Sequence, residues 1–156
     1  MRKLLLALIL AGCGTDLRQP GDGWDERAKP IIREFTDDIK VYEIPLGKLG
    51  RILNIRQNSA KLAEYASENP EEHLLGVCLI STGSPGRLWR GEILILEDLD
   101  DETFRRVMYH ELTHCVYELD HWGEEGDIQY PTVWIDVFSW EDAKGRHFRE
   151  LKRRLE

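Results

Sequence analysis

The spacing of apolar residues predicts a helix at the start of the folded region. Four apolar side chains recur at intervals of one to four residues that place them on one helix face: Ile31, Ile32, Phe35 and Ile39. Pro30 suits the first turn of such a helix, where its missing N–H costs no hydrogen bond. We therefore expect the fold to begin near Trp24.

Shorter patterns predict strands and a small helix in the first half of the chain. The apolar runs at residues 41–45 and 51–56 are typical of strands, and residues 59–67 favour a helix. Residues 74–80 and 92–96 are also strand-like, and turn-forming residues separate them. These last two strands are expected to pair as neighbours.

Two longer helices are predicted in the second half. The first begins at Asp100 or Asp101, either of which can cap it, and its apolar residues cover most of its circumference: Phe104, Val107, Met108, Leu112, Cys115, Val116 and Leu119. Such a helix is expected inside the molecule. Ser139 opens the terminal helix, whose buried stripe would contain Phe148, Leu151 and Leu155. Together the elements predict an α+β fold with a small mixed sheet packed on a central helix.

Composition and charge narrow the class of protein. The 156 residues are 42% hydrophobic and include five Trp, which is enough apolar surface for one folded domain. The net charge is −8, and it becomes −10 without the first twelve residues, which hold Arg2 and Lys3 and no acid. A surface this acidic repels phosphate backbones, so nucleic acid is not expected as a partner.

The N-terminus has the pattern of a secretory signal. Arg2 and Lys3 precede the apolar residues 4–11, a run too short to span a bilayer. Leu10-Ala11-Gly12-Cys13 resembles a bacterial lipobox, and this resemblance implies cleavage before Cys13, which would carry the lipid. The chain would then comprise a lipoprotein signal peptide (1–12), a flexible tether (13–23) and a folded domain (24–156). An ordinary secretory signal, or an apolar start to the domain, is the alternative.

The cysteines outside the lipobox could form a disulfide if the protein is exported. If Cys13 is lipidated, Cys78 and Cys115 remain in an environment that permits disulfides. We expect them to form a disulfide, and two separate buried thiols are the alternative.

One motif carries chemistry: His110-Glu111-Leu112-Thr113-His114 has the pattern H-E-x-x-H, placed on the apolar helix. Residues four apart on a helix differ by about 40° around its axis and about 6 Å along it, so the two imidazoles can share one metal ion. Glu111 lies about 100° around the axis from His110, within reach of a water that the metal activates. Zinc lowers the pKa of such a water, and a carboxylate takes its proton as it attacks a carbonyl. The motif predicts a zinc site for peptide-bond hydrolysis, and an unrelated surface pair of histidines is the alternative.

A catalytic zinc site has three protein ligands, and Asp120 and His121 are candidates for the third. On a continuous helix His121 would lie about 10 Å beyond His114, so the chain is expected to turn back after Tyr117 or Glu118. We assign the ligand to His121, because imidazole is the commonest protein ligand to metals and Asp120 could then accept an N–H from a ligating histidine. A site with Asp120 as the ligand is the alternative.

Residues 110–121 resemble the metzincin metallopeptidases, whose pattern is H-E-x-x-H-x-x-G-x-x-H/D followed by a turn with a methionine under the zinc. They are also similar to small bacterial and phage-type lipoproteins predicted to be metallopeptidases, which have H-E-L-G-H-C and a histidine at the position of His121. The resemblance covers the lipobox, the strand of Cys78 and residues 92–134. Tyr117 replaces the metzincin glycine, and Trp134 stands where the methionine would be.

The resemblance implies a zinc endopeptidase, anchored by lipid in the bacterial envelope, with His110, His114 and His121 binding zinc and Glu111 as general base and acid. Gly14 after the lipidated cysteine favours the outer membrane if the source is Gram-negative. An edge strand at residues 92–96 would align a peptide substrate, and acidic loop residues weakly indicate basic or polar substrates: Glu124, Glu125 and Asp127. A non-catalytic lipoprotein that binds a partner is one alternative, and Glu141 as the third zinc ligand is another.

Other polar residues are expected to have structural roles and not catalytic ones. His73 and His147 are expected on the surface. Tyr117 and Tyr130 are expected to pack in the core, although either hydroxyl could donate to an oxyanion. Ser84 is expected to be a turn residue without a nucleophile's context.

Overall fold

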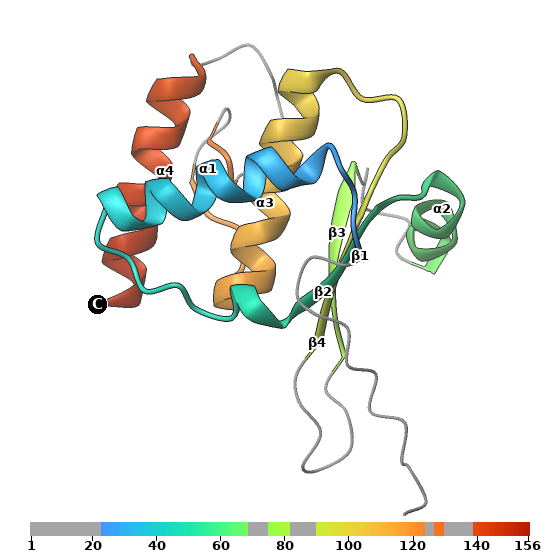
Figure 1. The fold of residues 1–156 in the computed structure, drawn as a ribbon, viewed down its shortest axis with the longest axis horizontal. Coiled ribbons are helices and arrows are strands. Elements are labelled where there is room, and N and C mark those ends of the chain that lie inside the picture. Colours follow the sequence, from blue (N-terminus) through green and yellow to red (C-terminus); the bar gives the residue numbers. More distant parts are fainter. Residues whose placement is uncertain (1–22, 69–74, 82–89, 124–126, 130–138) are drawn as a thin grey trace, which may run out of the picture.

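A computed structural model of the chain describes residues 23–68, 75–81, 90–123, 127–129 and 139–156. These residues form an α+β fold with four α-helices and a small mixed sheet, as the sequence predicted (Figure 1). The expected signal peptide, Cys13 and nearly all of the tether lie outside the described residues. None of the helices in the described ranges is both long enough and apolar enough to cross a membrane.

The sheet has the strand order β1-β2-β4-β3. β1 (Gly23–Trp24), β2 (Ile52–Gln57) and β4 (Arg90–Ile95) are parallel, and β3 (Gly76–Ser81) pairs antiparallel with β4. The expected pairing of the two strands on either side of the turn-forming segment is confirmed. The expected edge strand at residues 92–96 is wrong, because β4 lies between β2 and β3. Its run Ile93-Leu94-Ile95 is buried on both faces, which is typical of an interior strand.

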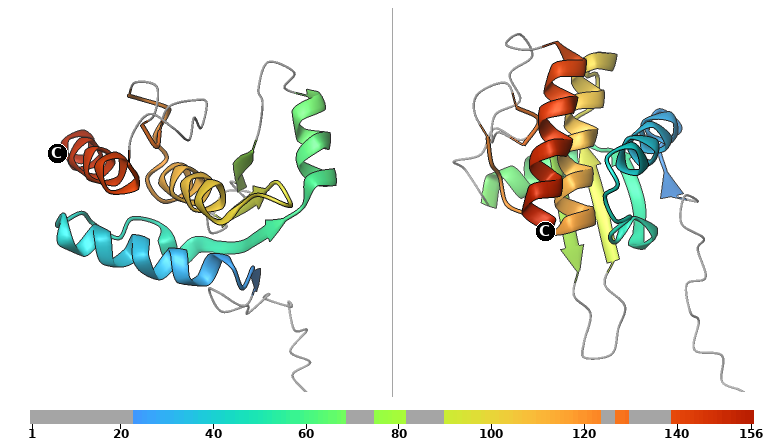
Figure 2. Two further views of the ribbon diagram at one scale, coloured as in Figure 1. Left: turned by 90° about the horizontal axis from the view of Figure 1, so that it is seen from above. Right: turned by 90° about the vertical axis from the view of Figure 1, so that its left-hand side faces the viewer.

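Helices cover both faces of the sheet. Figures 1 and 2 show α1 (Ala28–Val41), α3 (Asp101–Tyr117) and α4 (Trp140–Leu155) on one side and α2 (Ser59–Glu68) on the other. Ile93 and Ile95 belong to the main core with α1, α3 and α4, whereas Leu94 points the other way and packs with Leu62 and Val77. This alternation follows from the two-residue period of a strand. α3 therefore lies between the sheet and the outer helices, as its apolar circumference predicted.

The expected strand at residues 41–45 is wrong, because α1 continues through Val41 and then closes in a tight turn. Glu43 has a positive φ of 57°, its N–H donates to Lys40 O, and the N–H of Ile44 donates to Ile39 O. These are the two hydrogen bonds of a Schellman motif, which ends a helix and brings together two apolar side chains, here Ile44 and Ile39. Within the run that suggested a strand, Ile44 thus closes the helix and enters the core, whereas Val41 is exposed.

Both ends of α3 are held by specific contacts. Asp100 is the N-cap, and its carboxylate accepts from the N–H groups of Glu102 and Thr103. At the other end the chain leaves the helix through Glu118, which adopts the left-handed conformation with φ 56°. The Lys48 N–H donates to Val116 O, one of the carbonyls that a helix end leaves without an internal partner. The chain therefore turns back directly after the helix, as expected.

His147 is buried at 2% exposure, so its expected surface position is wrong. It lies on the inner face of α4, four residues before the buried Leu151, and its ring stacks on Trp122 with an interplanar angle of 6°. Burial lowers its pKa to about 3, so the ring is neutral at pH 7. Phe148 and Leu151 are buried as predicted, whereas Leu155 is 38% exposed at the last turn.

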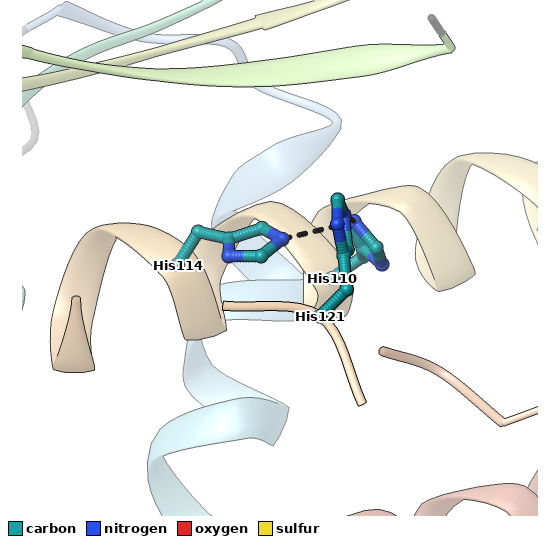
Figure 3. Close-up of side chains that lie close together, drawn as sticks. All are labelled: His110, His114 and His121. Atoms are coloured by element: carbon teal, nitrogen blue, oxygen red, sulfur yellow. Dashed lines mark hydrogen bonds between the residues drawn. The ribbon is translucent and has the colours of Figure 1, made fainter. Parts of the chain in front are cut away.

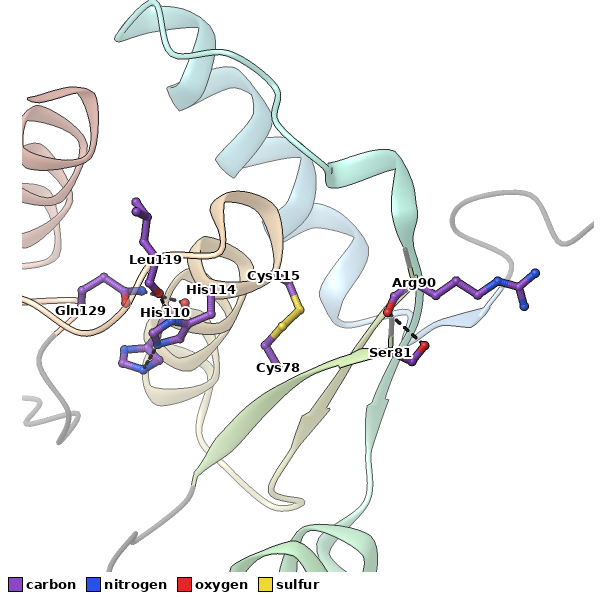
Figure 4. Close-up of a disulfide and its surroundings, with 8 residues drawn as sticks. All are labelled: Cys78, Ser81, Arg90, His110, His114, Cys115, Leu119 and Gln129. Carbon is purple, nitrogen blue, oxygen red and sulfur yellow. Dashed lines mark hydrogen bonds between the residues drawn. A yellow bond between two sulfur atoms is a disulfide. The ribbon is translucent and has the colours of Figure 1, made fainter. Parts of the chain in front are cut away.

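A disulfide joins Cys78 of β3 to Cys115 of α3, the pairing expected from the cysteine count (Figure 4). The two Cα atoms are 5.6 Å apart, and the cysteines are 37 positions apart in sequence. The bond ties the edge of the sheet to the helix at the residue after His114.

Replacing both cysteines with alanine is expected to lower the free energy of unfolding by about 3 to 4 kcal/mol, because the bond restricts a long loop of the unfolded chain. Denaturant unfolding measures this loss. A reducing agent should destabilise the parent by a similar amount and leave the double variant unchanged. Equal stability of the oxidised parent and the double variant would contradict this role.

Candidate metal centre

Three histidines meet at the end of α3. His110 and His114 project from the helix, and His121 arrives from the segment that follows the turn at Glu118 (Figure 3). The Nε2 atom of His110 lies 3.1 Å from the Nε2 atoms of both His114 and His121. Each ring offers one ligand atom, and the three atoms all lie within 4.8 Å of one another. The three side chains therefore lie close enough to hold a metal ion.

Hydrogen bonds to backbone carbonyls orient two of these rings. The Nδ1 atom of His110 lies 2.6 Å from Ile128 O, and that of His114 lies 2.6 Å from Leu119 O. A carbonyl oxygen only accepts hydrogen bonds, so in both rings the proton must be on Nδ1. Nε2 then carries a lone pair, which is the form in which imidazole binds a metal.

Burial keeps the same two rings neutral. His110 is 5% exposed, and burial lowers its pKa to about 3, with the neighbouring His114 adding to the effect. Burial also lowers the pKa of His114, although its hydrogen bond to Leu119 O and the charge of Asp120 oppose the shift. Neutral rings leave both lone pairs available at pH 7.

This arrangement fits a cation. The Nε2 atoms of His110 and His114 face each other at 3.1 Å with no proton between them, so their lone pairs repel unless a positive ion lies nearby. Three ligands about 2.0 to 2.1 Å from a tetrahedral metal ion would be about 3.3 Å apart, close to the 3.1 Å that separates His110 Nε2 from each of the other two Nε2 atoms. His121 is exposed, which leaves the cluster accessible from solvent. The geometry therefore suits a site with three protein ligands and one open position.

The segment around residue 128 supports His110 from behind. Gln129 is fully buried, and its Nε2 atom donates to His110 O at 2.7 Å (Figure 4). The preceding residue, Ile128, accepts the hydrogen bond from the His110 ring. The N–H of Trp122 donates to Gln129 O, which joins this segment to the residue after His121. These contacts could not be predicted from the sequence, because backbone carbonyls carry no sequence signature and Gln129 lies in a polar stretch.

Glu111 lies between the two helical histidines in sequence and is 5% exposed. Its side chain packs against Gly76, the first residue of β3. A Cβ atom built at Gly76 would lie 2.6 Å from Val107 Cγ1, 2.9 Å from Glu111 Cγ and 3.0 Å from Glu111 Oε1. Such distances are too short for real side chains, so only glycine allows this approach. Gly76 lies inside the strand-like run at residues 74–80, and an isolated glycine in a strand is the sequence signal that could have indicated this contact.

The structure leaves several candidates outside the cluster. Asp120 is exposed and does not join the three histidines, and the Glu141 carboxylate pairs with Lys144 instead. The Tyr117 hydroxyl donates to Pro45 O at 2.7 Å, which agrees with a packing role. Asp127 pairs with Arg146. Six other expectations concern residues outside the described ranges: His73, Ser84, Glu124, Glu125, Tyr130 and Trp134.

No protein-family model, curated protein sequence or solved structure matches the chain. The three convergent histidines and the adjacent buried carboxylate are thus the features on which a function can be assigned.

Proposed function

We propose that the protein is a zinc-dependent endopeptidase with His110, His114 and His121 as ligands and Glu111 as the general base and acid. The observation that carries the proposal is the convergence of three Nε2 atoms, two of them fixed as lone-pair donors by backbone carbonyls. Three nitrogen ligands and an open position are typical of catalytic zinc, whereas structural zinc sites usually have four protein ligands. The resemblance of residues 110–121 to metzincins supports the same activity.

A bound zinc ion would polarise the scissile carbonyl and make a water molecule nucleophilic at neutral pH. Glu111 would accept a proton from this water on a carboxylate oxygen as the water attacks the carbonyl carbon. Glu111 would then return the proton to the nitrogen of the leaving amine as the peptide bond breaks. The hydrogen bonds to Ile128 O and Leu119 O keep the histidine rings oriented throughout.

The edge strand β3 is the element suited to align a peptide. Its backbone pairs with β4 on one side only among the described strands, and Gly76 brings that backbone against Glu111. An extended substrate that added to this edge would lie next to the catalytic carboxylate. We therefore propose that a substrate strand would pair with β3 and not with residues 92–96.

The proposed location is the bacterial envelope, with a lipid on Cys13 as the membrane anchor. The support is Leu10-Ala11-Gly12-Cys13 and the apolar run before it.

Metal analysis combined with peptide cleavage tests the activity. The purified protein is expected to contain about one zinc ion per chain and to cleave internal bonds of a mixed peptide library. Chelation should abolish cleavage, and added zinc should restore it. A zinc-loaded protein that cleaves no peptide or protein substrate would favour the non-catalytic binding lipoprotein instead.

Gly76→Ala is expected to lower kcat/KM by about 10- to 100-fold while zinc content stays near one per chain. The new methyl group would displace the side chains of both Val107 and Glu111, and a shift of about 1 Å in a catalytic group has effects of this size. Steady-state kinetics and metal analysis measure the two quantities. Gly50→Ala is the matched control, because a Cβ atom there meets nothing within 4 Å. Equal activity of the two variants would show that Gly76 does not position Glu111.

A further inference from the structure

The third proposed zinc ligand comes from a segment outside the helices. His110 and His114 belong to α3, whose backbone fixes where their side chains begin. His121 is exposed and follows the turn at Glu118. A ligand on such a segment is placed less precisely than one on a helix unless other contacts hold its backbone. The contacts of the next residue, Trp122, therefore bear directly on the position of His121.

Trp122 is buried at 8% exposure, although His121 and Gly123 on either side of it are exposed. Its indole ring packs in the main core and stacks on His147 of α4, with ring centroids 5.7 Å apart and an interplanar angle of 6°. The Arg154 guanidinium, further along α4, lies 4.8 Å from the centroid of the indole. Stacking and cation–π contacts thus anchor the residue after His121 on α4.

The backbone of Trp122 is tied to α3 through a closed turn. Its N–H donates to Gln129 O at 3.0 Å, and the side chain of Gln129 donates to His110 O at 2.7 Å. Gly123 permits the turn, because it has a φ of 96° and a Cβ atom there would lie 2.6 Å from Asp127 Oδ2. The segment that begins at Trp122 is therefore connected to the helix that carries the other two ligands.

We propose that Trp122 is the positioning residue of the third zinc ligand: its ring, anchored on α4, holds the backbone that brings His121 to the ion. Without this anchor His121 would spend part of the time away from the cluster. The apparent zinc affinity would then fall in proportion to the fraction of molecules in which all three ligands converge. This inference rests on the zinc site of the proposed function and not on peptidase activity, because zinc affinity is the quantity that it predicts.

Trp122→Ala is expected to weaken zinc binding about 10- to 100-fold, the range for losing a residue that supports a metal ligand. Competition with a zinc chelator measures the affinity. Trp122→Phe keeps a ring that can stack on His147 and should weaken binding less than about threefold. Trp122→Leu fills much of the same space without a planar ring and should bind about 5-fold more weakly than Trp122→Phe. These two apolar replacements give the answer even if the alanine variant does not fold.

Trp24→Ala is the matched control. Trp24 lies on β1, at the opposite edge of the sheet from β3, packs against the main core and donates to Ile52 O. Its loss should lower stability but change zinc affinity less than about twofold. Denaturant unfolding of the zinc-free variants compares their stabilities. A similar loss of zinc affinity in Trp24→Ala would show that Trp122 acts through stability alone and would overturn the proposal.

A double-mutant cycle tests whether Trp122 acts through His121. In the His121→Ala background, titrated with zinc at high concentration, Trp122→Ala should weaken the residual binding less than about threefold, because the ligand that it places is gone. An undiminished effect in that background, parental zinc affinity in folded Trp122→Ala, or equal affinities of Trp122→Phe and Trp122→Leu would each overturn the proposal. A parent that binds no zinc, or a His121→Ala variant that keeps it, would instead contradict the proposed zinc site itself, and this inference with it.

Discussion

Glu111→Gln is expected to abolish peptide hydrolysis, by several orders of magnitude in kcat, while the protein still binds about one zinc ion per chain. Glutamine has nearly the same shape but cannot accept the proton of the attacking water, so the chemistry is lost and the ligand geometry is kept. The buried position against Gly76 also favours an isosteric replacement over a smaller one.

Glu102→Gln is the matched control for this result. Glu102 lies in the first turn of the same helix, is exposed and pairs with Arg106 and not with the histidine cluster, so the same substitution there should leave kcat unchanged. Peptide hydrolysis at saturating substrate and metal analysis are the measurements. Full activity in Glu111→Gln would rule out the proposed mechanism even if zinc is present.

The second prediction concerns zinc binding by the third protein ligand, His121. His121→Ala is expected to lose zinc almost completely, because two histidines alone hold the ion poorly. Asp120→Ala should lose only about 10- to 100-fold in affinity, since its carboxylate does not join the cluster and acts on His114 through its charge. Competition with a zinc chelator measures both affinities.

The reverse result would identify Asp120 as the third ligand. In that case Asp120→Ala would lose its zinc and His121→Ala would keep it, as in the metzincin register. Each variant is the control for the other, because the two residues are adjacent and both are exposed.

The sequence predicted the features that depend on local spacing. The apolar pattern from Asp100 onward indicated a buried helix, and the spacing of His110 and His114 indicated that their rings lie close enough to hold one metal ion. The need for a chain reversal followed from helix geometry, and the turn occurs at Glu118. These predictions hold because they depend on the rise and rotation of one helix.

Three features were not predicted correctly, and one of them depends on the pairing of distant strands. Residues 41–45 contain the apolar pattern of a strand, yet Ile44 is used to close α1. β4 is interior because β2 pairs with it across a long connection, which no local pattern in residues 92–96 reports. His147 was misplaced because its type is usually exposed, although its spacing from Leu151 placed it on the buried face.

X-ray diffraction from a crystal of the zinc-loaded protein, with data collected on both sides of the zinc absorption edge, tests the central claim most directly. The account predicts one strong anomalous peak with the Nε2 atoms of His110, His114 and His121 each about 2.0 to 2.1 Å away, and with room for a further ligand. A fully loaded crystal whose zinc lies elsewhere, or whose zinc is enclosed by four protein ligands, would contradict it.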